Sequence, residues 1–390
     1  LFISNKASAD YFARNLNNNT KAMKYLEERA INMEMIKEFH LGYSLDSWDS
    51  LRNELQKNKL VNNAIDAGLL IKTDKKIYDR FRNRVMFPIK NSSGNIIGFG
   101  GRSFENNKEA KYINSPETKL FHKSYELYGL YESKKYISKN NQVIIVEGYT
   151  DIIGLHQSGV KNCVATLGTA FTKYHFSKII KYTSNLVFCF DGDNAGKNAA
   201  WKAIQNLLPD LKDEIQIKIV FLPDGHDPDS AVKQSKDTFI DMINNALPLS
   251  EYIILYIKDG LDLDNVEGKT QFFLRAKDVI KMMPEITYTN ILKRTLEEIA
   301  GNKLDSITVK KSLNSNSMAQ TEVDHDIREI TLINLLIEYP DLVLEHNYED
   351  FITNIFLKEI YELIRNKKNN NESFSGAQLM SIYPNNELIN

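Results

Sequence analysis

The sequence predicts an α/β fold, with a parallel sheet at its centre, an α+β region before it and helices after it. Three observations support this class. Between residues 140 and 235, four apolar runs are each followed by a segment with helical spacing, the pattern of a parallel sheet covered on both faces. Residues 77–105 hold two short β-rich runs around a Ser-Ser-Gly-Asn turn. Residues 1–75 and 248–311 carry apolar residues near a 3.6-residue period.

Composition narrows the class of protein. With 390 residues, the chain is long enough for two or three domains that each bury a core. Lys and Arg total 49 against 51 Asp and Glu, so the net charge of −2 does not indicate whether the protein binds nucleic acid. The two cysteines, Cys163 and Cys189, stand far apart in apolar runs, which argues against a disulfide framework and a Cys-rich zinc site.

Hydropathy and the first residue suggest where the protein acts. No run approaches the roughly 18 consecutive apolar residues that a membrane helix needs. No signal peptide precedes the predicted fold. We therefore expect a cytoplasmic protein without a membrane partner. The chain begins with Leu1 rather than Met, and we expect it to be an excised part of a longer protein.

The N-terminal elements are expected to be helices followed by a hairpin. Four segments carry the helical spacing, namely ADYFARNL, KAMKYLEERAI, MEMIKEFHLGYS and WDSLRNELQKNKL. The stretch RVMFPIKNSSGNIIGFGGRSF then predicts a hairpin followed by a glycine-rich bend. We assign residues 1–138 to one α+β subdomain.

Four strand–helix units come next. They are QVIIVEGYTDIIGLHQSG, NCVATLGTAFTKYHFSKII, NLVFCFDGDNAGKNAAWKAIQNLL and IQIKIVFLPDGHDPDSAVKQS. We assign residues 139–245 to this sheet domain and residues 246–312 to a helical subdomain. The polar stretch KKSLNSNSMAQTEVD predicts a linker at 313–325. The amphipathic segments after it predict the partial, helical region 326–390.

Carboxylates follow three of the four predicted strands. In an open parallel sheet, ligands bind just past the carboxyl ends of the strands. A single acid at such a place commonly caps the next helix, but a whole set would repel without a counter-charge. Hard divalent cations with oxygen ligands resolve that conflict, and such clusters indicate phosphoryl or nucleotidyl transfer. The acids are Glu147, Asp151, Asp191, Asp193, Asp224, Asp227 and Asp229.

A basic block runs from Arg80 to Lys123. It holds nine Lys or Arg and three Glu, a local excess of six positive charges. One interpretation is a solvated surface. The other is a nucleic-acid groove, because aromatic residues alternate with the basic ones, as in surfaces that follow a phosphate backbone and stack on bases. The glycines beside Arg102 suit close approach of the backbone to a phosphate.

The motifs EGYTD, DGDNAG and LPDGHDPDS together resemble the toprim domain, in which a Glu comes from the first strand and an Asp-x-Asp pair from a later one. Topoisomerases and some nucleases share that core. The upstream motifs RFRNRVMFPI, IGFGGR, KYINSPET and FHKSYELYGLYE narrow the resemblance to the RNA polymerase domain of bacterial replicative, DnaG-type primases. This resemblance runs from about residue 10 to about residue 245, and the region after 325 resembles the start of the helicase-interaction domain.

The resemblance implies synthesis of short RNA primers from ribonucleoside triphosphates on a single-stranded DNA template. It implies two or more Mg²⁺ or Mn²⁺ ions, and no zinc in this part of the chain. The catalytic residues that it implies are Glu147, Asp191 and Asp193. The metal ligands that it implies are Glu147, Asp151, Asp191, Asp193, Asp227 and Asp229. The nucleotide- and DNA-binding residues that it implies are Arg82, Arg84, Arg102, Lys111, Tyr112, Asn114 and Lys123.

The resemblance also implies partners. We expect a monomer at the bacterial nucleoid and replisome, with the replicative helicase bound through the C-terminal region. Two other interpretations stay open: another toprim enzyme, nuclease or topoisomerase-like, and a non-catalytic toprim factor that binds nucleic acid. A topoisomerase needs a strand-passage domain, and none is evident in the remaining length. The motifs RFRNRV and KYINSP argue against a non-catalytic factor.

Overall fold

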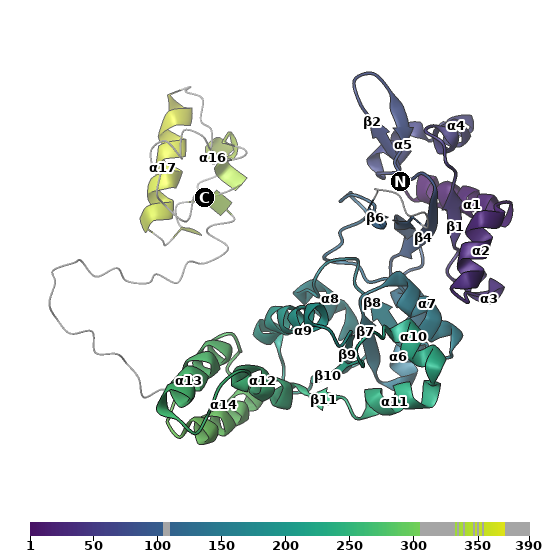
Figure 1. The fold of residues 1–390 in the computed structure, drawn as a ribbon. Coiled ribbons are helices and arrows are strands. Elements are labelled where there is room, and N and C mark those ends of the chain that lie inside the picture. The colour runs from purple at the N-terminus through teal and green to yellow at the C-terminus, as the bar shows by residue number, and fades with distance from the viewer. Residues whose placement is uncertain are drawn as a thin grey trace. The chain divides into compact units, whose positions relative to one another are not determined.

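The structure is a computed structural model (Figure 1). The residues that it describes are 1–103, 110–304, 332–333, 335–337, 340–345, 348, 351–352 and 355–370. The chain divides into two compact units, Leu1–Thr308 and Val309–Asn390. No helix in the described part of the chain is long and apolar enough to cross a lipid bilayer.

The N-terminal part of the first unit combines helices with a four-stranded antiparallel sheet. The helices are α1 (Phe2–Asn17), α2 (Thr20–Glu28), α3 (Met33–Glu38), α4 (Ser50–Lys57) and α5 (Val61–Asp66). The sheet has the order β1-β4-β5-β6, with β1 (Gly42–Ser44), β4 (Arg84–Lys90), β5 (Ile96–Arg102) and β6 (Tyr112–Asn114). A separate ribbon pairs β2 (Leu70–Lys72) with β3 (Ile77–Asp79). The predicted hairpin is confirmed as β4 and β5.

The helices predicted over residues 1–75 are interrupted by two short strands, so that part of the prediction was wrong. The helix expected over MEMIKEFHLGYS ends at Glu38. His40 then adopts φ +55°, which turns the chain out of the helix, and Tyr43 of β1 pairs with Val85 of β4. Strand β2 falls in the same range. Tertiary pairing overrode local spacing here, because the partner strand of β1 lies far along the chain.

The central sheet has five strands in the order β11-β10-β9-β7-β8. Its strands are β7 (Val143–Val146), β8 (Cys163–Ala165), β9 (Asn185–Phe190), β10 (Gln216–Phe221) and β11 (Leu247–Pro248). The first four are parallel, as predicted, and β11 adds an antiparallel edge. The helices between and beside them are α6 (Leu130–Asn140), α7 (Tyr149–Gln157), α8 (Lys173–Ile179), α9 (Asn194–Leu207), α10 (Pro228–Gln234) and α11 (Lys236–Asn244), with a 3₁₀ turn at Leu208–Asp210.

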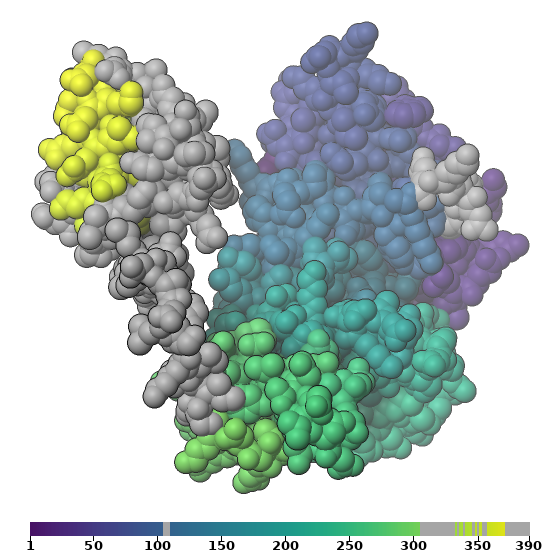
Figure 2. Space-filling view, turned by 60° about the vertical axis from the view of Figure 1, so that its left-hand side comes forward, coloured from purple at the N-terminus to yellow at the C-terminus, as the bar shows by residue number. Residues whose placement is uncertain are grey.

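Alternate residues of the sheet bury two different cores. Ile144 and Val146 of β7 pack with α7, α10 and α11, and that cluster continues into β4 and β5 of the N-terminal sheet. Val143 and Ile145 face the opposite side, where α8 and α9 pack. Because one core spans both sheets, the N-terminal part is fixed against the central sheet, and Figure 2 shows their atoms as one continuous surface.

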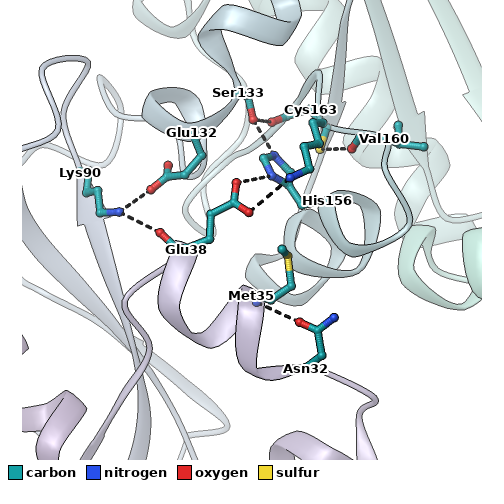
Figure 3. A network of polar contacts seen from close by, with 10 residues as sticks. Asn32, Met35, Glu38, Lys90, Glu132, Ser133, His156, Val160 and Cys163 are labelled. Carbon is teal, nitrogen blue, oxygen red and sulfur yellow. Dashed lines mark hydrogen bonds and ion pairs between the residues drawn. The ribbon is translucent and has the colours of Figure 1, made fainter.

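A buried polar network also joins these parts (Figure 3). Ser133 Oγ of α6 donates to the carbonyl oxygen of Cys163 at 2.6 Å and lies 2.9 Å from His156 Nε2 of α7. His156 Nδ1 lies 3.4 Å from a carboxylate oxygen of Glu38 in α3. Beside it, Lys90 of β4 forms an ion pair with Glu132 at 2.6 Å. The network therefore links elements from both sheets.

Helices follow the central sheet. α12 (Leu249–Lys258), α13 (Val266–Lys281) and α14 (Thr287–Ala300) pack in the same core as α8 and α9. The second unit holds α16 (Leu342–Glu345) and α17 (Ile355–Asn369) around a small apolar cluster of its own. The predicted linker at 313–325 lies outside the described residues, and so does much of 326–390. The predicted domain boundaries within the first unit stay predictions.

Candidate active site

The carboxylates gather at one edge of the central sheet. Strands β7, β9 and β10 run in parallel and in register, with Ile145 opposite Phe188 and Phe190 opposite Phe221. Their carboxyl ends therefore meet at the same edge. Glu147 follows β7 directly and Asp191 follows β9 directly. The loop after β10 carries Asp224 and Asp227. A Cβ atom on Gly192 would collide with the carbonyl oxygen of Leu222, so only glycine lets these two loops approach so closely.

Four of the acids, Glu147, Asp191, Asp193 and Asp227, are electrostatically coupled. The pKa of Glu147 is raised first by burial and then by the charges of Asp191 and Asp193. The pKa of Asp191 is raised in the same way, by burial and then by Asp227 and Asp193. Each acid keeps part of its surface exposed although its carboxylate is partly withdrawn from water. A cation at this edge would relieve the repulsion.

Asp151 is the buried member of the set. It has 8% of its surface exposed, and one carboxylate oxygen accepts a hydrogen bond from the Gly148 amide at 3.0 Å. Burial raises the pKa of Asp151 to about 7, and the charges of Asp227 and Asp191 contribute. Asp151 therefore fixes the start of α7, directly after Glu147.

Two further acids cap helices in this structure. Asp193 Oδ1 accepts from the Gly196 amide at 2.7 Å at the start of α9. Asp227 Oδ1 accepts from the Ser230 amide at 2.7 Å at the start of α10. The capping explanation is correct for both residues. It uses one oxygen of each carboxylate, and among the described residues the other oxygen accepts no hydrogen bond.

Asp229 has a different environment. Its Oδ2 accepts from Lys233 Nζ at 2.7 Å, one turn along α10. Its Oδ1 is buried and has no hydrogen-bond partner among the described residues. Burial raises the pKa of Asp229, while the Lys233 ammonium lowers it.

The donor set fits hard divalent ions. All six predicted ligands supply carboxylate oxygens, and Glu147, Asp191, Asp193 and Asp227 keep exposed surface. No group of three His, Cys, Asp or Glu side chains in the described ranges is arranged to enclose a metal ion. The carboxylates thus share one field without converging on one point.

Two arginines of the predicted groove are buried. Arg84 has 3% of its surface exposed, and its guanidinium donates to backbone carbonyls, among them that of Ala110 at 2.8 Å. Arg102 has 4% exposed and bonds the Tyr112 hydroxyl while lying 4.9 Å from the centre of that ring. Its Nε is buried without a hydrogen-bond partner among the described residues. These arginines therefore also support β5 and β6.

The other groove residues are more accessible or join the two sheets. Lys111 is exposed and Lys123 half-buried. Arg82 lies 4.0 Å from the centre of the exposed Trp48 ring. Asn114 accepts from the Tyr149 hydroxyl at 2.7 Å and donates to the Leu167 carbonyl at 2.8 Å, so it fixes β6 to the central sheet.

Sequence reasoning missed Tyr25 of α2 and Arg29, the residue directly after α2, which lie between the basic and acidic groups. The Arg102 guanidinium lies 5.6 Å from the Tyr25 ring, and Arg29 lies at the same distance from that ring. The Arg29 charge lowers the pKa of Asp229. No motif marked them, because helical spacing accounts for the segment KAMKYLEERAI without any site.

Comparison with known proteins identifies the family. One family model, the DNA primase catalytic core N-terminal domain, matches residues 11–134, and a Toprim-like model matches 144–232. A solved structure of the Escherichia coli primase catalytic core is 36% identical with a TM-score of 0.73, covering 78% of this chain and 99% of that one. The chain belongs to the DnaG-type primase family. The predicted resemblance and the α/β fold with a toprim sheet are confirmed.

Similarity to other DnaG-type primases supports the same family assignment. The DNA primase of Legionella pneumophila is 38% identical over 340 residues, which are 86% of this chain and 58% of that protein. A DnaG primase catalytic domain solved with bound single-stranded DNA is 37% identical with a TM-score of 0.70, covering 76% of this chain and 97% of that one. The chain spans about half the length of the curated relatives it matches.

Proposed function

We propose that this chain is the catalytic core of a DNA primase, which joins ribonucleoside triphosphates into short RNA primers on single-stranded DNA. The observation that carries the proposal is the acidic edge of the central sheet standing beside a basic and aromatic surface fixed to it through a shared core. Family membership and the relative solved with single-stranded DNA support it. No observation favours a topoisomerase, a nuclease or a non-catalytic factor.

The acidic edge would hold the divalent ions. Glu147, Asp191 and Asp193 would be the central ligands, with Asp227 beside them and Asp151 holding the start of α7. Bound Mg²⁺ or Mn²⁺ supplies activation of a primer 3′-hydroxyl and neutralisation of the triphosphate. Because a divalent ion binds the ionised carboxylates, metal affinity should fall as they take up protons.

The basic surface would bind the polyanions. Lys111, which is exposed, and Lys123, which is half-buried, would contact phosphates. The ring of Tyr112, held by Arg102, offers a surface for stacking. Arg82 with Trp48 offers a second one. We further propose that the protein acts as a monomer in the bacterial cytoplasm and that residues 326–390 contact the replicative helicase.

The decisive experiment measures incorporation of labelled ribonucleotides on single-stranded DNA, with Mg²⁺, with Mn²⁺ and with a chelator. We expect short RNA products that require a template and a divalent ion. DNA nicking or relaxation without RNA products would overturn the proposal. Binding of DNA without either reaction would favour a non-catalytic factor instead.

A further inference from the structure

Asp229 already faces a cationic side chain. Lys233 Nζ lies 2.7 Å from Asp229 Oδ2, and the two residues stand one turn apart on α10. The Asp229 side chain has 14% of its surface exposed and that of Lys233 has 31%. Water therefore screens this pair less than an ion pair on an open surface.

A second contact holds the ammonium in place. Lys233 Nζ also donates to the carbonyl oxygen of Arg29 at 2.8 Å, at the end of α2. Gln157 of α7 holds the same turn, because its Nε2 donates to the Ala30 carbonyl at 2.6 Å and its Oε1 accepts from the Asn32 amide at 2.9 Å. The Lys233 ammonium is thus held between Asp229 on α10 and the turn after α2.

The other oxygen of Asp229 faces helix α7. A Cβ atom on Gly154 would collide with Asp229 Oδ1, so this carboxylate fills the space that the glycine leaves. That oxygen has no hydrogen-bond partner in the described part of the chain. Its two oxygens are therefore directed at Lys233 and α7.

Charge coupling links Asp229 to Asp227 and Asp151, and not to Glu147 or Asp191. The charges that raise the pKa of Glu147 belong to Asp191 and Asp193, and those that raise the pKa of Asp191 belong to Asp227 and Asp193. Asp229 is in neither set. Its charge contributes to the raised pKa of the buried Asp151, after those of Asp227 and Asp191.

We propose that Lys233 keeps Asp229 out of direct metal coordination, so that the other carboxylates hold the ions and the Asp229–Lys233 pair ties α10 to the turn after α2. This inference rests on the proposed function. The ammonium occupies the lone-pair side of Oδ2 and repels an approaching cation. Without Lys233, the Asp229 carboxylate would be a largely buried charge with no cationic partner. A divalent ion could then bind it.

The first test counts bound ions without measuring activity. The whole chain, free of nucleic acid and nucleotide, is titrated with Mn²⁺ at mildly alkaline pH while the spin resonance signal of free Mn²⁺ is followed. We expect Asp229→Asn to bind as many ions as the unchanged protein, with dissociation constants within about threefold. Asp191→Asn should lose an ion or weaken binding more than tenfold.

The second test changes the ammonium. Lys233→Met should raise the affinity for at least one Mn²⁺ more than threefold, because it frees the Asp229 charge. Lys233→Arg keeps the charge and should titrate as the unchanged protein does. Lys24→Met is the matched control, because it removes the cation of another pair one helical turn apart, Lys24 with Glu28 on α2. Thermal melting shows which variants are folded.

Two results would overturn the inference alone: loss of an ion or of more than threefold affinity in Asp229→Asn, or an unchanged titration in folded Lys233→Met. The Asp229→Asn result decides the matter if Lys233→Met does not fold. Failure of the unchanged protein to bind any Mn²⁺ would overturn the proposed function and this inference together.

Discussion

Asp191 is the residue on which the acidic edge depends. Its charge raises the pKa of both Glu147 and Asp151. We expect Asp191→Asn to reduce primer synthesis more than tenfold, a barrier increase above ~1.4 kcal/mol. The melting temperature in chelator should hold or rise, because the change removes one of several repelling charges.

Ribonucleotide incorporation and thermal melting check both parts of this prediction. Asp278→Asn is the control, because that exposed carboxylate lies on α13, with its nearest ion-pair partner on the same helix at 3.8 Å. The control should change neither quantity. An Asp191→Asn variant that keeps more than a tenth of the activity would remove Asp191 from the ligand set.

Asp151 gives the metal-free protein a pH dependence. Its folded pKa is about 7, whereas an unfolded Asp titrates near ~3.9. Between these values the folded state keeps a proton that the unfolded state has lost. The free energy of unfolding should therefore fall as pH rises through this window, by about 1.4 kcal/mol per pH unit for one proton, and level off above it.

Glu147 and Asp191, whose pKa values are also raised, contribute with the same sign. Urea unfolding in chelator at several pH values measures the slope. Asp151→Asn should flatten it, and an equally steep slope in that variant would show that other groups cause the effect. Added Mg²⁺ should also flatten it, because a bound cation favours the ionised carboxylates.

The sequence predicted which carboxylates stand at the sheet edge, because strand ends can be read from apolar runs. It could not predict which of them already have partners. Asp229 faces Lys233 through a helical spacing that also occurs on any solvated helix. Arg84 was expected in the groove, yet its guanidinium bonds backbone carbonyls, which only the folded chain brings near.

At the scale of elements, the junction of α3, α6 and α7 depends on Ser133 (Figure 3). Its hydroxyl donates to the Cys163 carbonyl and contacts His156. The side chains of Ser133 and His156 are both buried. Ser133→Ala removes one hydrogen-bond partner from the buried Cys163 carbonyl and one from the buried His156 ring. We expect a loss of about 1–3 kcal/mol in the free energy of unfolding.

Ser177→Ala is the matched control. That hydroxyl also donates to a backbone carbonyl, of Lys173 at 2.9 Å, but it lies on an exposed face of α8. Ser177→Ala should lower the free energy of unfolding by less than ~0.5 kcal/mol. Urea unfolding compares the two variants, and equal losses would show that burial of the network contributes nothing.

The elements that the sequence predicted best are those with a local signature. Three of the parallel strands, β7, β8 and β9, are nearly continuous apolar runs, β10 alternates polar and apolar residues at its start, and the β4–β5 hairpin has Gly94 at φ +90° in its turn. The strand β1 escaped prediction because its residues Gly42, Tyr43 and Ser44 form no apolar run, unlike the equally short β8. Its identity depends on β4, which lies beyond two helices and a separate ribbon.

At the scale of the whole molecule, the proposed activity needs the first unit alone. The acidic edge and the basic surface both lie within Leu1–Thr308, which buries its own cores. Among its described residues, the second unit has a separate cluster of eight buried apolar side chains. Such a small core protects backbone amides less than the central sheet does.

We therefore expect that removing residues 309–390 leaves primer synthesis on naked single-stranded DNA within about twofold. In the whole chain, the amides of α17 should exchange with solvent faster than those of β7, β9 and β10, as hydrogen exchange with mass spectrometry would show. The helicase should bind the whole chain weakly and the shortened chain not at all. Loss of synthesis in the shortened chain would show that the second unit takes part in the reaction, and tight helicase binding by the second unit would contradict the weak binding expected here.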